Sequence, residues 1–120
     1  MTIIEQYWAT ASAGDWAGFG ALLAHDIVYE LPQTRERVRG RERYVRFNAE
    51  YPAGWRLTIE QSYVDAGGGA SWATFTMDGE TMPAVTFFRF DPAGLITHVT
   101  DFWPEPYDPP AGREHLVERY

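Results

Sequence analysis

Cysteine and lysine are both absent from this chain of 120 residues. Without cysteine the chain has no disulfide, no thiol nucleophile and no cysteine-ligated zinc site. Without lysine it has no side-chain amine for Schiff-base chemistry, since all ten basic residues are Arg. No run of about 18 apolar residues occurs either. These absences exclude several classes of enzyme and argue against a helical membrane protein.

The length and the apolar content of 45% fit one domain that spans residues 1–120. A domain of this size can bury a core and still enclose one pocket. The N-terminal segment shows no basic region followed by an apolar one, so no secretory signal is visible. We therefore expect a cytoplasmic protein.

Negative charge dominates the chain but is unevenly distributed. The net charge is −7, yet residues 35–46 hold six Arg against Glu36 and Glu42 and carry +4, which leaves −11 for the rest. The overall acidity argues against nucleic-acid binding, which needs a dominant basic face. Arg46 lies four residues from both Glu42 and Glu50, a spacing at which charges pair along a helix. We interpret the basic segment mainly as a solvated, ion-paired surface, with an anion site as the lesser alternative.

The first half of the chain is predicted to be mainly helical, because apolar residues recur at helical spacing and Asp15 can cap a helix. The pattern predicts a helix over 3–12 that ends at Gly14, a second helix from Asp15 through Leu23, a short strand over 27–31, a polar loop over 33–40, and a third helix between Gly40 and Pro52.

The second half is predicted to be an antiparallel meander. Turn signals at Gly67-Gly68-Gly69, Asp78-Gly79 and residues 91–94 separate strands over 55–65, 70–77, 81–90 and 95–103. Helices followed by such a meander indicate an α+β fold, and a strongly curved sheet would leave a pocket that aromatic residues can wall. Four of the eight prolines fall within 104–110, so residues 104–120 are expected to form an extended tail with a last helical turn over 113–120.

Five local signatures occur in order along the chain: residues 7–15 ending in Gly14-Asp15, residues 24–32, Gly40-Arg41-Glu42, residues 88–96 and residues 96–103. Together they resemble the nuclear transport factor 2-like superfamily over roughly residues 3–105. That superfamily includes ketosteroid isomerases, SnoaL-like polyketide cyclases and limonene epoxide hydrolases. The resemblance implies a cone-shaped curved sheet wrapped around the N-terminal helices, with one central apolar pocket, usually in a homodimer. It also implies a small apolar organic ligand, and we expect no cofactor, no metal and no membrane partner.

Side chains alternate along a strand, so the last strand should present Asp101 on one face and His98 on the other. By resemblance the face with Asp101 looks into the pocket. The resulting candidates for substrate binding are Leu31, Phe47, Ala73, Phe75, Met77, Met82, Ala84, Thr86, Phe88, Thr97, Val99 and Trp103. The outer face of the sheet (Trp72, Thr74, Thr76, His98, Thr100 and Phe102) is then the candidate dimer surface.

The resemblance to ketosteroid isomerase holds only in part. Tyr7 falls at the oxyanion-binding tyrosine of that family and Trp103 at a pocket tryptophan. The general base of the family precedes a proline, where this chain has Leu31, and its second carboxylic acid falls at Thr86. Leucine cannot move a proton, and threonine is a weak donor compared with a neutral carboxylic acid. The same reaction by the same residues is therefore not expected.

A carboxylate does occur at Asp101, where cyclases and epoxide hydrolases of the superfamily carry an acidic residue. In an aromatic pocket its pKa would rise towards that of a useful general acid or base. Tyr7 or Tyr29 could then hydrogen-bond a developing enolate oxygen. We therefore expect a cofactor-free enzyme of the cyclase or isomerase type, a polyketide cyclase-like isomerase or lyase, that acts on an apolar carbonyl compound, with Asp101, Tyr7 and Tyr29 as its catalytic residues.

Two alternatives remain open. If Asp101 is a satisfied structural carboxylate, the pocket belongs to a non-catalytic protein that binds a hydrophobic ligand or serves a dimeric interaction. The third possibility is an epoxide hydrolase-like reaction. It ranks last, because the family pattern needs an Arg and an Asp two residues apart on a neighbouring strand, and the inward positions Ala73, Phe75 and Met77 are apolar here.

Overall fold

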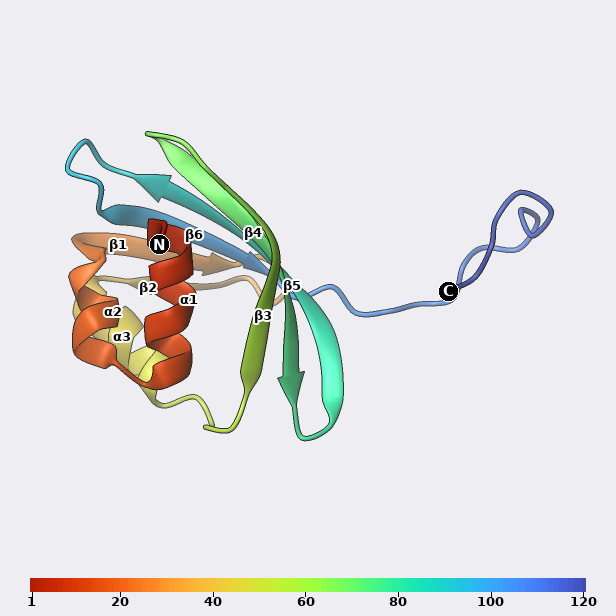
Figure 1. Cartoon of the computed structure of the whole chain (residues 1–120), viewed down its shortest axis with the longest axis horizontal. Coiled ribbons are helices and arrows are strands. Elements are labelled where there is room, and N and C mark those ends of the chain that lie inside the picture. The colour runs from red at the N-terminus through yellow and green to blue at the C-terminus, as the bar shows by residue number, and fades with distance from the viewer.

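A computed structural model that covers all 120 residues shows a six-stranded sheet that bends over three helices (Figure 1). The helices are α1 (Ile3–Ala13), α2 (Trp16–Ala21) and α3 (Arg41–Ala49). The strands are β1 (Leu23–Leu31), β2 (Glu36–Arg39), β3 (Arg56–Val64), β4 (Gly68–Met77), β5 (Glu80–Phe90) and β6 (Ile96–Phe102). Their order across the sheet is β2-β1-β6-β5-β4-β3. Neighbouring strands are antiparallel except for β1 and β6, which are parallel. The predicted α+β architecture with a curved sheet around N-terminal helices is confirmed.

The two N-terminal helices have well-defined ends. Thr2 and Glu5 form a capping box at the start of α1, in which each side chain accepts a hydrogen bond from the backbone N–H of the other. Gly14 ends α1 in the left-handed conformation (φ 69°), which glycine adopts without strain. The Asp15 side chain accepts a hydrogen bond from Gly18 N and begins α2. These ends fix the direction of α1, which turns Tyr7 and Trp8 towards the sheet.

Two of the predicted elements are corrected by the structure. The second helix ends at Ala21 and Leu23 already belongs to β1, so the helix predicted through Leu23 is too long. Leu23 is fully buried beside Ile96 of β6, and this tertiary packing places it in the strand. The predicted loop over 33–40 contains β2, which pairs with β1 at the edge of the sheet. Val38 is the only buried residue in β2, so the strand has almost no apolar alternation.

The last strand contains an irregularity at Thr97. Arg89 pairs with His98 and Phe90 pairs with Ile96, so Thr97 has no partner in this register. Such a bulge interrupts the alternation of side chains. As a result both Ile96 and Val99 are fully buried, although simple alternation assigns them to opposite faces. Beyond the bulge Val99 and Asp101 are buried and His98 is exposed, as alternation predicts.

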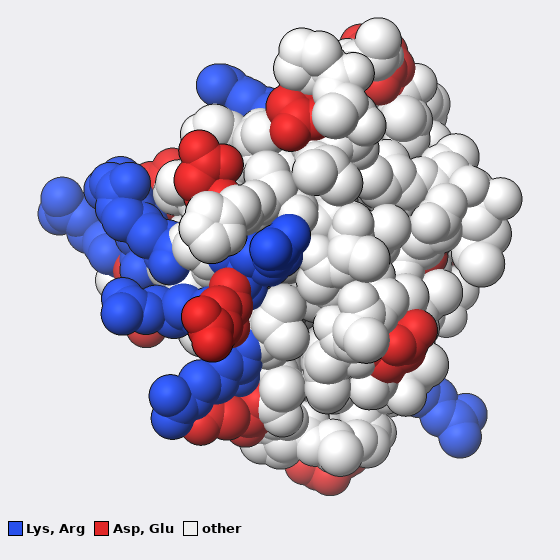
Figure 2. Space-filling view, turned by 90° about the vertical axis from the view of Figure 1, so that its left-hand side faces the viewer, with Lys and Arg blue, Asp and Glu red and all other residues white.

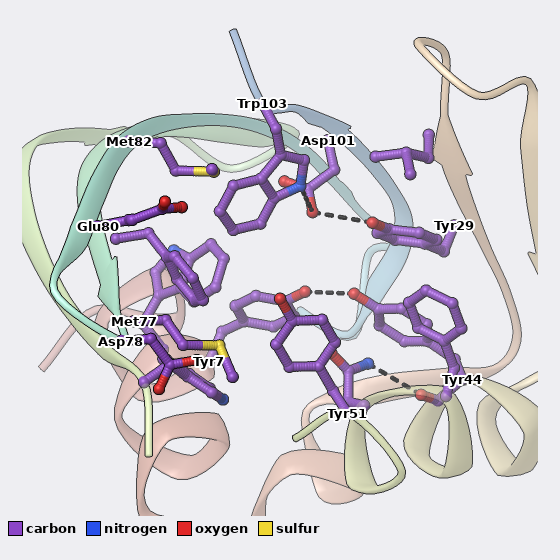
Figure 3. A pocket seen from close by; sticks show the side chains of 16 residues that line it. Tyr7, Tyr29, Tyr44, Tyr51, Met77, Asp78, Glu80, Met82, Asp101 and Trp103 are labelled. Carbon is purple, nitrogen blue, oxygen red and sulfur yellow. Dashed lines mark hydrogen bonds between the residues drawn. The ribbon is translucent and has the colours of Figure 1, made fainter. Parts of the chain in front are cut away.

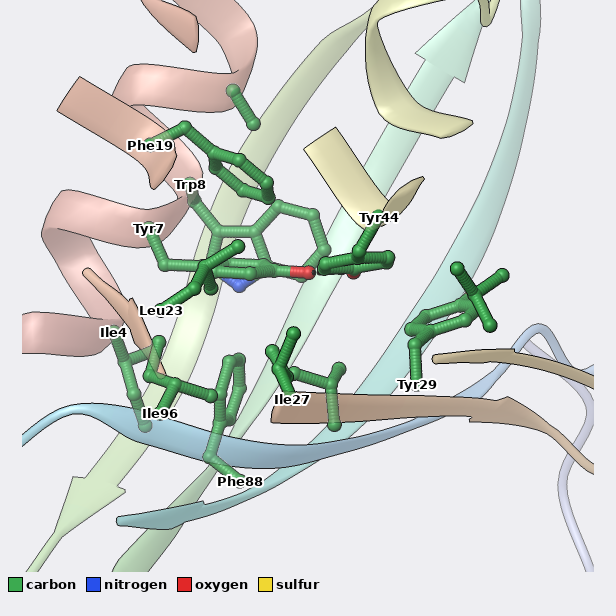
Figure 4. Close-up of a cluster of buried hydrophobic side chains, with 13 residues drawn as sticks. Ile4, Tyr7, Trp8, Phe19, Leu23, Ile27, Tyr29, Tyr44, Phe88 and Ile96 are labelled. Carbon is green, nitrogen blue, oxygen red and sulfur yellow. Dashed lines mark hydrogen bonds between the residues drawn. The ribbon is translucent and has the colours of Figure 1, made fainter. Parts of the chain in front are cut away.

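Aliphatic and aromatic side chains from α1, α2, β1, β5 and β6 pack together into the core (Figure 4). Its fully buried members include Ile4, Phe19, Leu23, Ile27 and Val99. Tyr7 and Tyr44 lie at the border of this cluster, with Tyr7 in edge contact with Phe88 at 5.0 Å between ring centroids. The core therefore fills the space under one half of the sheet.

Beyond residue 103 the chain leaves the end of β6 and extends away from the sheet (Figure 1). It contains no helix or strand there, and the predicted helical turn over 113–120 is reduced to one hydrogen bond from Leu116 N to Arg113 O. Gln33 fixes the backbone at Trp103, where the tail begins, because its side-chain amide donates to the carbonyl of Trp103 and accepts from its N–H. None of the helices has the length and apolar character needed to cross a membrane.

Candidate functional site

A cavity of about 440 Å³ lies beside the core, between α1, α3 and the concave side of the sheet (Figure 3). A volume of this size is typical of sites for small organic molecules. Twelve of its sixteen lining residues are hydrophobic. The lining consists of Tyr7, Trp8, Tyr29, Leu31, Tyr44, Phe47, Asn48, Tyr51, Trp55, Phe75, Met77, Asp78, Glu80, Met82, Asp101 and Trp103.

The structure brings together the three residues predicted to be catalytic, since Tyr7, Tyr29 and Asp101 all line this cavity. Six of the residues predicted to bind substrate line it as well: Leu31, Phe47, Phe75, Met77, Met82 and Trp103.

The other six predicted residues do not reach the cavity. Ala73 and Ala84 pair with each other across β4 and β5, and both are fully buried. Phe88 and Val99 belong to the packed core. Two further corrections concern threonines. Thr86 is fully buried and bonds Asp101 from the neighbouring strand, and Thr97 sits at the bulge, where its hydroxyl bonds Arg89 O instead.

Asp101 is the only buried charged side chain of the protein and is 5% exposed. Its Oδ1 accepts a hydrogen bond from the Thr86 hydroxyl at 2.6 Å. Its Oδ2 accepts one from the Tyr29 hydroxyl at 2.9 Å and one from Trp103 Nε1 at 3.1 Å. All three donors are neutral, so the negative charge is held without a cationic partner. The two ion pairs of the protein, Arg37–Glu30 and Arg46–Glu50, lie elsewhere on the surface.

Burial raises the pKa of Asp101 above its ordinary value, because an apolar environment disfavours the charged form. The hydrogen bonds from Thr86, Tyr29 and Trp103 act in the opposite direction and lower the pKa, but burial is the larger effect. A carboxyl group with a raised pKa exchanges protons more readily near neutral pH than an ordinary aspartate. Its environment therefore suits a general acid or base.

Tyr7 and Tyr44 face each other across the cavity wall, and their hydroxyl oxygens are hydrogen-bonded (Figure 3). Both side chains are almost fully buried, at 2% and 1% exposure. Burial raises the pKa of both hydroxyls, so both keep their protons. Two hydroxyls carry two protons, and one bond between them uses only one. The remaining O–H can donate to a ligand oxygen, whereas the Tyr29 proton is engaged by Asp101.

Aromatic rings form most of the remaining wall. Trp103 meets Phe75 edge to face at 5.0 Å between centroids, and Trp55 stacks on Phe75 at 5.6 Å. Tyr29 stacks on Tyr44 at 4.7 Å. Rings in these arrangements support each other and present both faces and edges to the cavity.

Seven of the lining residues were not among the sites predicted from the sequence. Tyr44, Asn48 and Tyr51 are spaced as one face of α3 and its continuation, and this helical spacing is the signal that could have indicated them. For Trp8 and Trp55 the sequence offers no distinguishing signal, because Trp is common both in cores and at interfaces. Trp8 also donates a hydrogen bond to Ser71 at 3.0 Å. For the remaining two, Asp78 and Glu80, no signal was present beyond the predicted hairpin turn.

The Arg side chains of the basic segment 35–46 do not line the cavity and lie at one side of the molecule, mainly on β2 and α3 (Figure 2). Its Arg side chains are interleaved there with acidic ones. Arg46 pairs with Glu50 at 3.3 Å, as the helical spacing suggested, and Arg37 pairs with Glu30 of β1 at 2.7 Å.

Comparison with known proteins identifies the family. The SnoaL-like domain model matches residues 4–99. A crystal structure from Kribbella flavida, of a protein provisionally named a ketosteroid isomerase, is 47% identical with a TM-score of 0.94, and the match covers 98% of this chain and 87% of that one. An NTF-2-like protein of unknown function from Burkholderia xenovorans is 18% identical (TM-score 0.83), covering 98% of this chain and 92% of that one.

A further solved structure with the same fold is an LEH-like epoxide hydrolase from M. tuberculosis. It is 20% identical with a TM-score of 0.71, and the match covers 85% of this chain and 80% of that one. At this identity it shows the fold alone, as the Burkholderia protein does. No curated protein matches the chain. The family match over most of the chain and the close Kribbella structure show that the chain belongs to the SnoaL-like domain family of the nuclear transport factor 2-like superfamily.

Proposed function

We propose that this protein is a cofactor-free enzyme of the cyclase or isomerase type, and that Asp101 is its general acid and base. The observation that carries the proposal is a buried carboxylate, without any cationic partner, in the wall of an aromatic cavity. Buried charges in proteins are normally paired with an opposite charge or bound to a metal. A buried carboxylate without such a partner, in the wall of a cavity of ligand size, indicates a catalytic group.

The reaction begins when Asp101 takes a proton from a carbon next to a carbonyl group of the substrate. The C–H bond breaks, and its electron pair forms an enolate whose oxygen carries the negative charge. The free proton of the Tyr7–Tyr44 pair is hydrogen-bonded to that oxygen and stabilises the charge. Tyr29 and Trp103 orient the carboxyl group through their hydrogen bonds to Oδ2.

Two outcomes conserve atoms and electrons. In an isomerisation, Asp101 returns its proton to a different carbon of the same delocalised enolate. In a cyclisation, the enolate carbon attacks a second carbonyl carbon of the same molecule and forms a ring bond, and the resulting alkoxide takes the proton from Asp101. Neither path needs a cofactor.

The reaction differs in its residues from that of ketosteroid isomerases. Leu31 lines the cavity at the position of the ketosteroid isomerase base, and its side chain has no group that can carry a proton. Thr86 stands where the second acid is expected, and its hydroxyl is engaged by Asp101. The carboxyl group of Asp101 therefore has to act both as the general base and as the general acid.

Deuterium exchange tests the proposal without knowledge of the natural substrate. Flat aryl and polycyclic ketones are incubated with the protein in D₂O, and NMR follows the loss of the proton signal next to the carbonyl. We expect accelerated exchange in the parent protein and a decrease of ~100-fold or more in Asp101→Asn, the range typical of losing a general base. Glu60→Gln is the matched control, because Glu60 is exposed on β3 and does not line the cavity.

The alternative function is ligand binding without catalysis. The observation in its favour is that Asp101 already accepts three hydrogen bonds, as a structural carboxylate would. In that case a ketone binds with equal affinity to the parent and to Asp101→Asn, and its proton exchanges at the rate found without protein. These two results together would contradict the catalytic proposal.

We further propose that the protein forms a homodimer through the outer face of its sheet. Trp72 and Phe87 are half exposed there, and Phe87 meets Phe102 edge to face at 6.1 Å between centroids. An exposed apolar patch of this kind on a sheet is typical of an interface. Light scattering should give twice the chain mass of 13.7 kDa for the parent protein and the chain mass itself for Phe87→Glu. A parent protein that is monomeric at micromolar concentration contradicts the dimer.

A further inference from the structure

The charges that line the cavity are all of one sign. Asp78, Glu80 and Asp101 are among the sixteen lining residues, whereas none of the ten Arg or three His is. Neither Asp78 nor Glu80 forms an ion pair with any Arg of the protein. The lining therefore contributes a negative potential that no lining cation offsets, so an anionic ligand is disfavoured there and a cation is favoured.

The carboxylates occupy two different sides of the cavity. Asp101 lies next to Tyr29 and is buried, while Asp78 and Glu80 belong to the hairpin between β4 and β5 on the other side (Figure 3). Asp78 and Gly79 both have positive φ angles, 52° and 80°, as the tight two-residue turn of a hairpin requires. Asp78 and Glu80 are exposed, so the acidic pair marks the solvent side of the cavity.

The walls between these two sides consist of ring faces and edges. Nine of the sixteen lining residues are aromatic, among them Phe75, which contacts both Trp55 and Trp103. The faces of such rings attract cations through their electron density, and Trp is the strongest of them. Aromatic walls and carboxylates therefore favour the same kind of charge.

A third feature defines the buried end of the ligand. The Tyr7–Tyr44 pair is almost fully buried and has one O–H proton without a protein acceptor. A buried donor of this kind requires an acceptor. The ligand atom at this end is therefore an oxygen that accepts a hydrogen bond, such as that of a carbonyl group.

We propose that the ligand of this cavity is a cationic amine, protonated or quaternary, attached to a flat apolar body that carries a carbonyl oxygen. The oxygen binds the Tyr7–Tyr44 pair, and the positive charge lies against the aromatic wall near Asp78 and Glu80. This inference rests on the proposed function for the position of the carbonyl group and adds the charge of the substrate.

Three probes of nearly the same shape test the charge directly. They are para-acetylphenyl trimethylammonium, its neutral isostere para-tert-butylacetophenone, and the anion para-acetylbenzenesulfonate. Calorimetry at low salt should show the cation binding roughly tenfold more tightly than the neutral ketone, the size expected of a partly desolvated cation–π contact near carboxylates. The sulfonate should bind at least about tenfold more weakly than the neutral ketone.

A matched pair of variants locates the effect. In Asp78→Asn/Glu80→Gln the preference for the cation over the neutral ketone should fall to about threefold or less, because only the rings and Asp101 remain. Asp26→Asn/Glu60→Gln removes the same number of charges from exposed positions outside the cavity and should leave the preference unchanged. Added salt should weaken cation binding in the parent protein.

The proposal is overturned if the neutral ketone binds the parent protein as tightly as the cation, if the cation fails to bind at millimolar concentration, or if both double variants behave alike. Failure of the catalytic proposal gives a different result. In that case the cation is still preferred, but deuterium exchange next to its carbonyl is the same in the parent protein and in Asp101→Asn.

Discussion

The interior of this protein has two halves that are both rich in aromatic residues, but one is a packed core and the other contains a cavity. Under one half of the sheet, Phe19 and Tyr7 are surrounded by Ile4, Leu23 and Ile27, which fill the space between the rings (Figure 4). Under the other half, rings such as Phe75 line a cavity (Figure 3). Aromatic content alone therefore does not decide between core and cavity. The difference lies in the branched aliphatic side chains, which are abundant in the packed half and nearly absent from the lining.

Leu31 is the only branched aliphatic residue among those that line the cavity. The flexible side chains of Met77 and Met82 occupy the remaining non-aromatic apolar positions of the lining. Ala73 and Ala84, on the same two strands, are fully buried and have small side chains. Rigid rings that support one another keep a space open when no aliphatic side chain fills it. Tyr7, Tyr29 and Tyr44 belong to both halves and carry their hydroxyl groups at the border.

The largest expected effect compares the same substitution in the two halves. Phe19 is fully buried in the packed half, and Phe47 is 40% exposed beside the cavity, in contact with Tyr29 at 5.4 Å between centroids. Phe19→Ala should destabilise the protein by about 3–5 kcal/mol, the cost of a large cavity in a packed core. Phe47→Ala should cost about 1–2 kcal/mol, because less apolar surface is lost from a site that is already partly open.

Denaturant titration of the two variants, with equal slopes, measures both free energies of unfolding. Ligand binding should respond in the reverse order, since Phe47 lines the cavity and Phe19 does not. Equal losses of stability at the two positions would show that the cavity half is packed as tightly as the core, and the contrast between the halves would fail.

The sequence allowed the helices and most strands to be predicted, because each has a local periodic signal. Alternation placed Asp101 and His98 on opposite faces of the last strand, and the resemblance to the superfamily indicated that the Asp101 face looks inward. The edge strand β2 was missed, since one buried residue, Val38, does not make an alternating pattern. The bulge at Thr97 also has no local signal in the sequence. Because of it, the side chain of Thr97 does not reach the cavity, although alternation predicted that it would. Alternation alone cannot show where a strand is irregular.

Pairings between distant residues could not be predicted at all. The hydrogen bond between Tyr7 and Tyr44 joins positions 37 residues apart. The bond between Tyr29 and Asp101 joins positions 72 apart. The first depends on how α1 and α3 pack under the curved sheet, and the second on the pairing of β1 with β6 within it. Both arrangements are properties of the whole chain. The sequence therefore indicated Tyr7, Tyr29 and Asp101 one by one. Only the structure shows that Tyr29 is hydrogen-bonded to the carboxylate, whereas the Tyr7–Tyr44 pair has a proton free for the ligand.

The smaller expected effect concerns charge, the second difference between the halves. The packed half contains no buried charge, and the cavity half contains only Asp101. Asparagine preserves the shape of Asp101 and one acceptor oxygen, so at neutral pH we expect Asp101→Asn to lie within about 2 kcal/mol of the parent protein in unfolding free energy. A larger loss would mark Asp101 as a structural carboxylate and favour the ligand-binding alternative.

The difference in unfolding free energy between the parent protein and Asp101→Asn should depend on pH, and this dependence gives a sharper test. Burial raises the pKa of Asp101 in the folded state, so between its unfolded and folded pKa values the folded protein binds more protons than the unfolded chain. The contribution of Asp101 to stability is therefore fully present below its unfolded pKa, near 3.8, and is lost as the pH rises through the folded value. Glu5 and Glu30 have lowered pKa values and the opposite sign, but both remain in the variant and cancel in the difference.

Unfolding free energies of the parent protein and Asp101→Asn, measured from pH 4 to pH 8, should therefore change in favour of the variant as the pH rises, and then become constant. A difference that changes in favour of the parent protein would mean that the three hydrogen bonds outweigh burial and that the pKa of Asp101 is lowered in the fold. The carboxyl group would then be a poor proton acceptor near neutral pH, because a stabilised carboxylate holds its negative charge too firmly to take a proton from carbon.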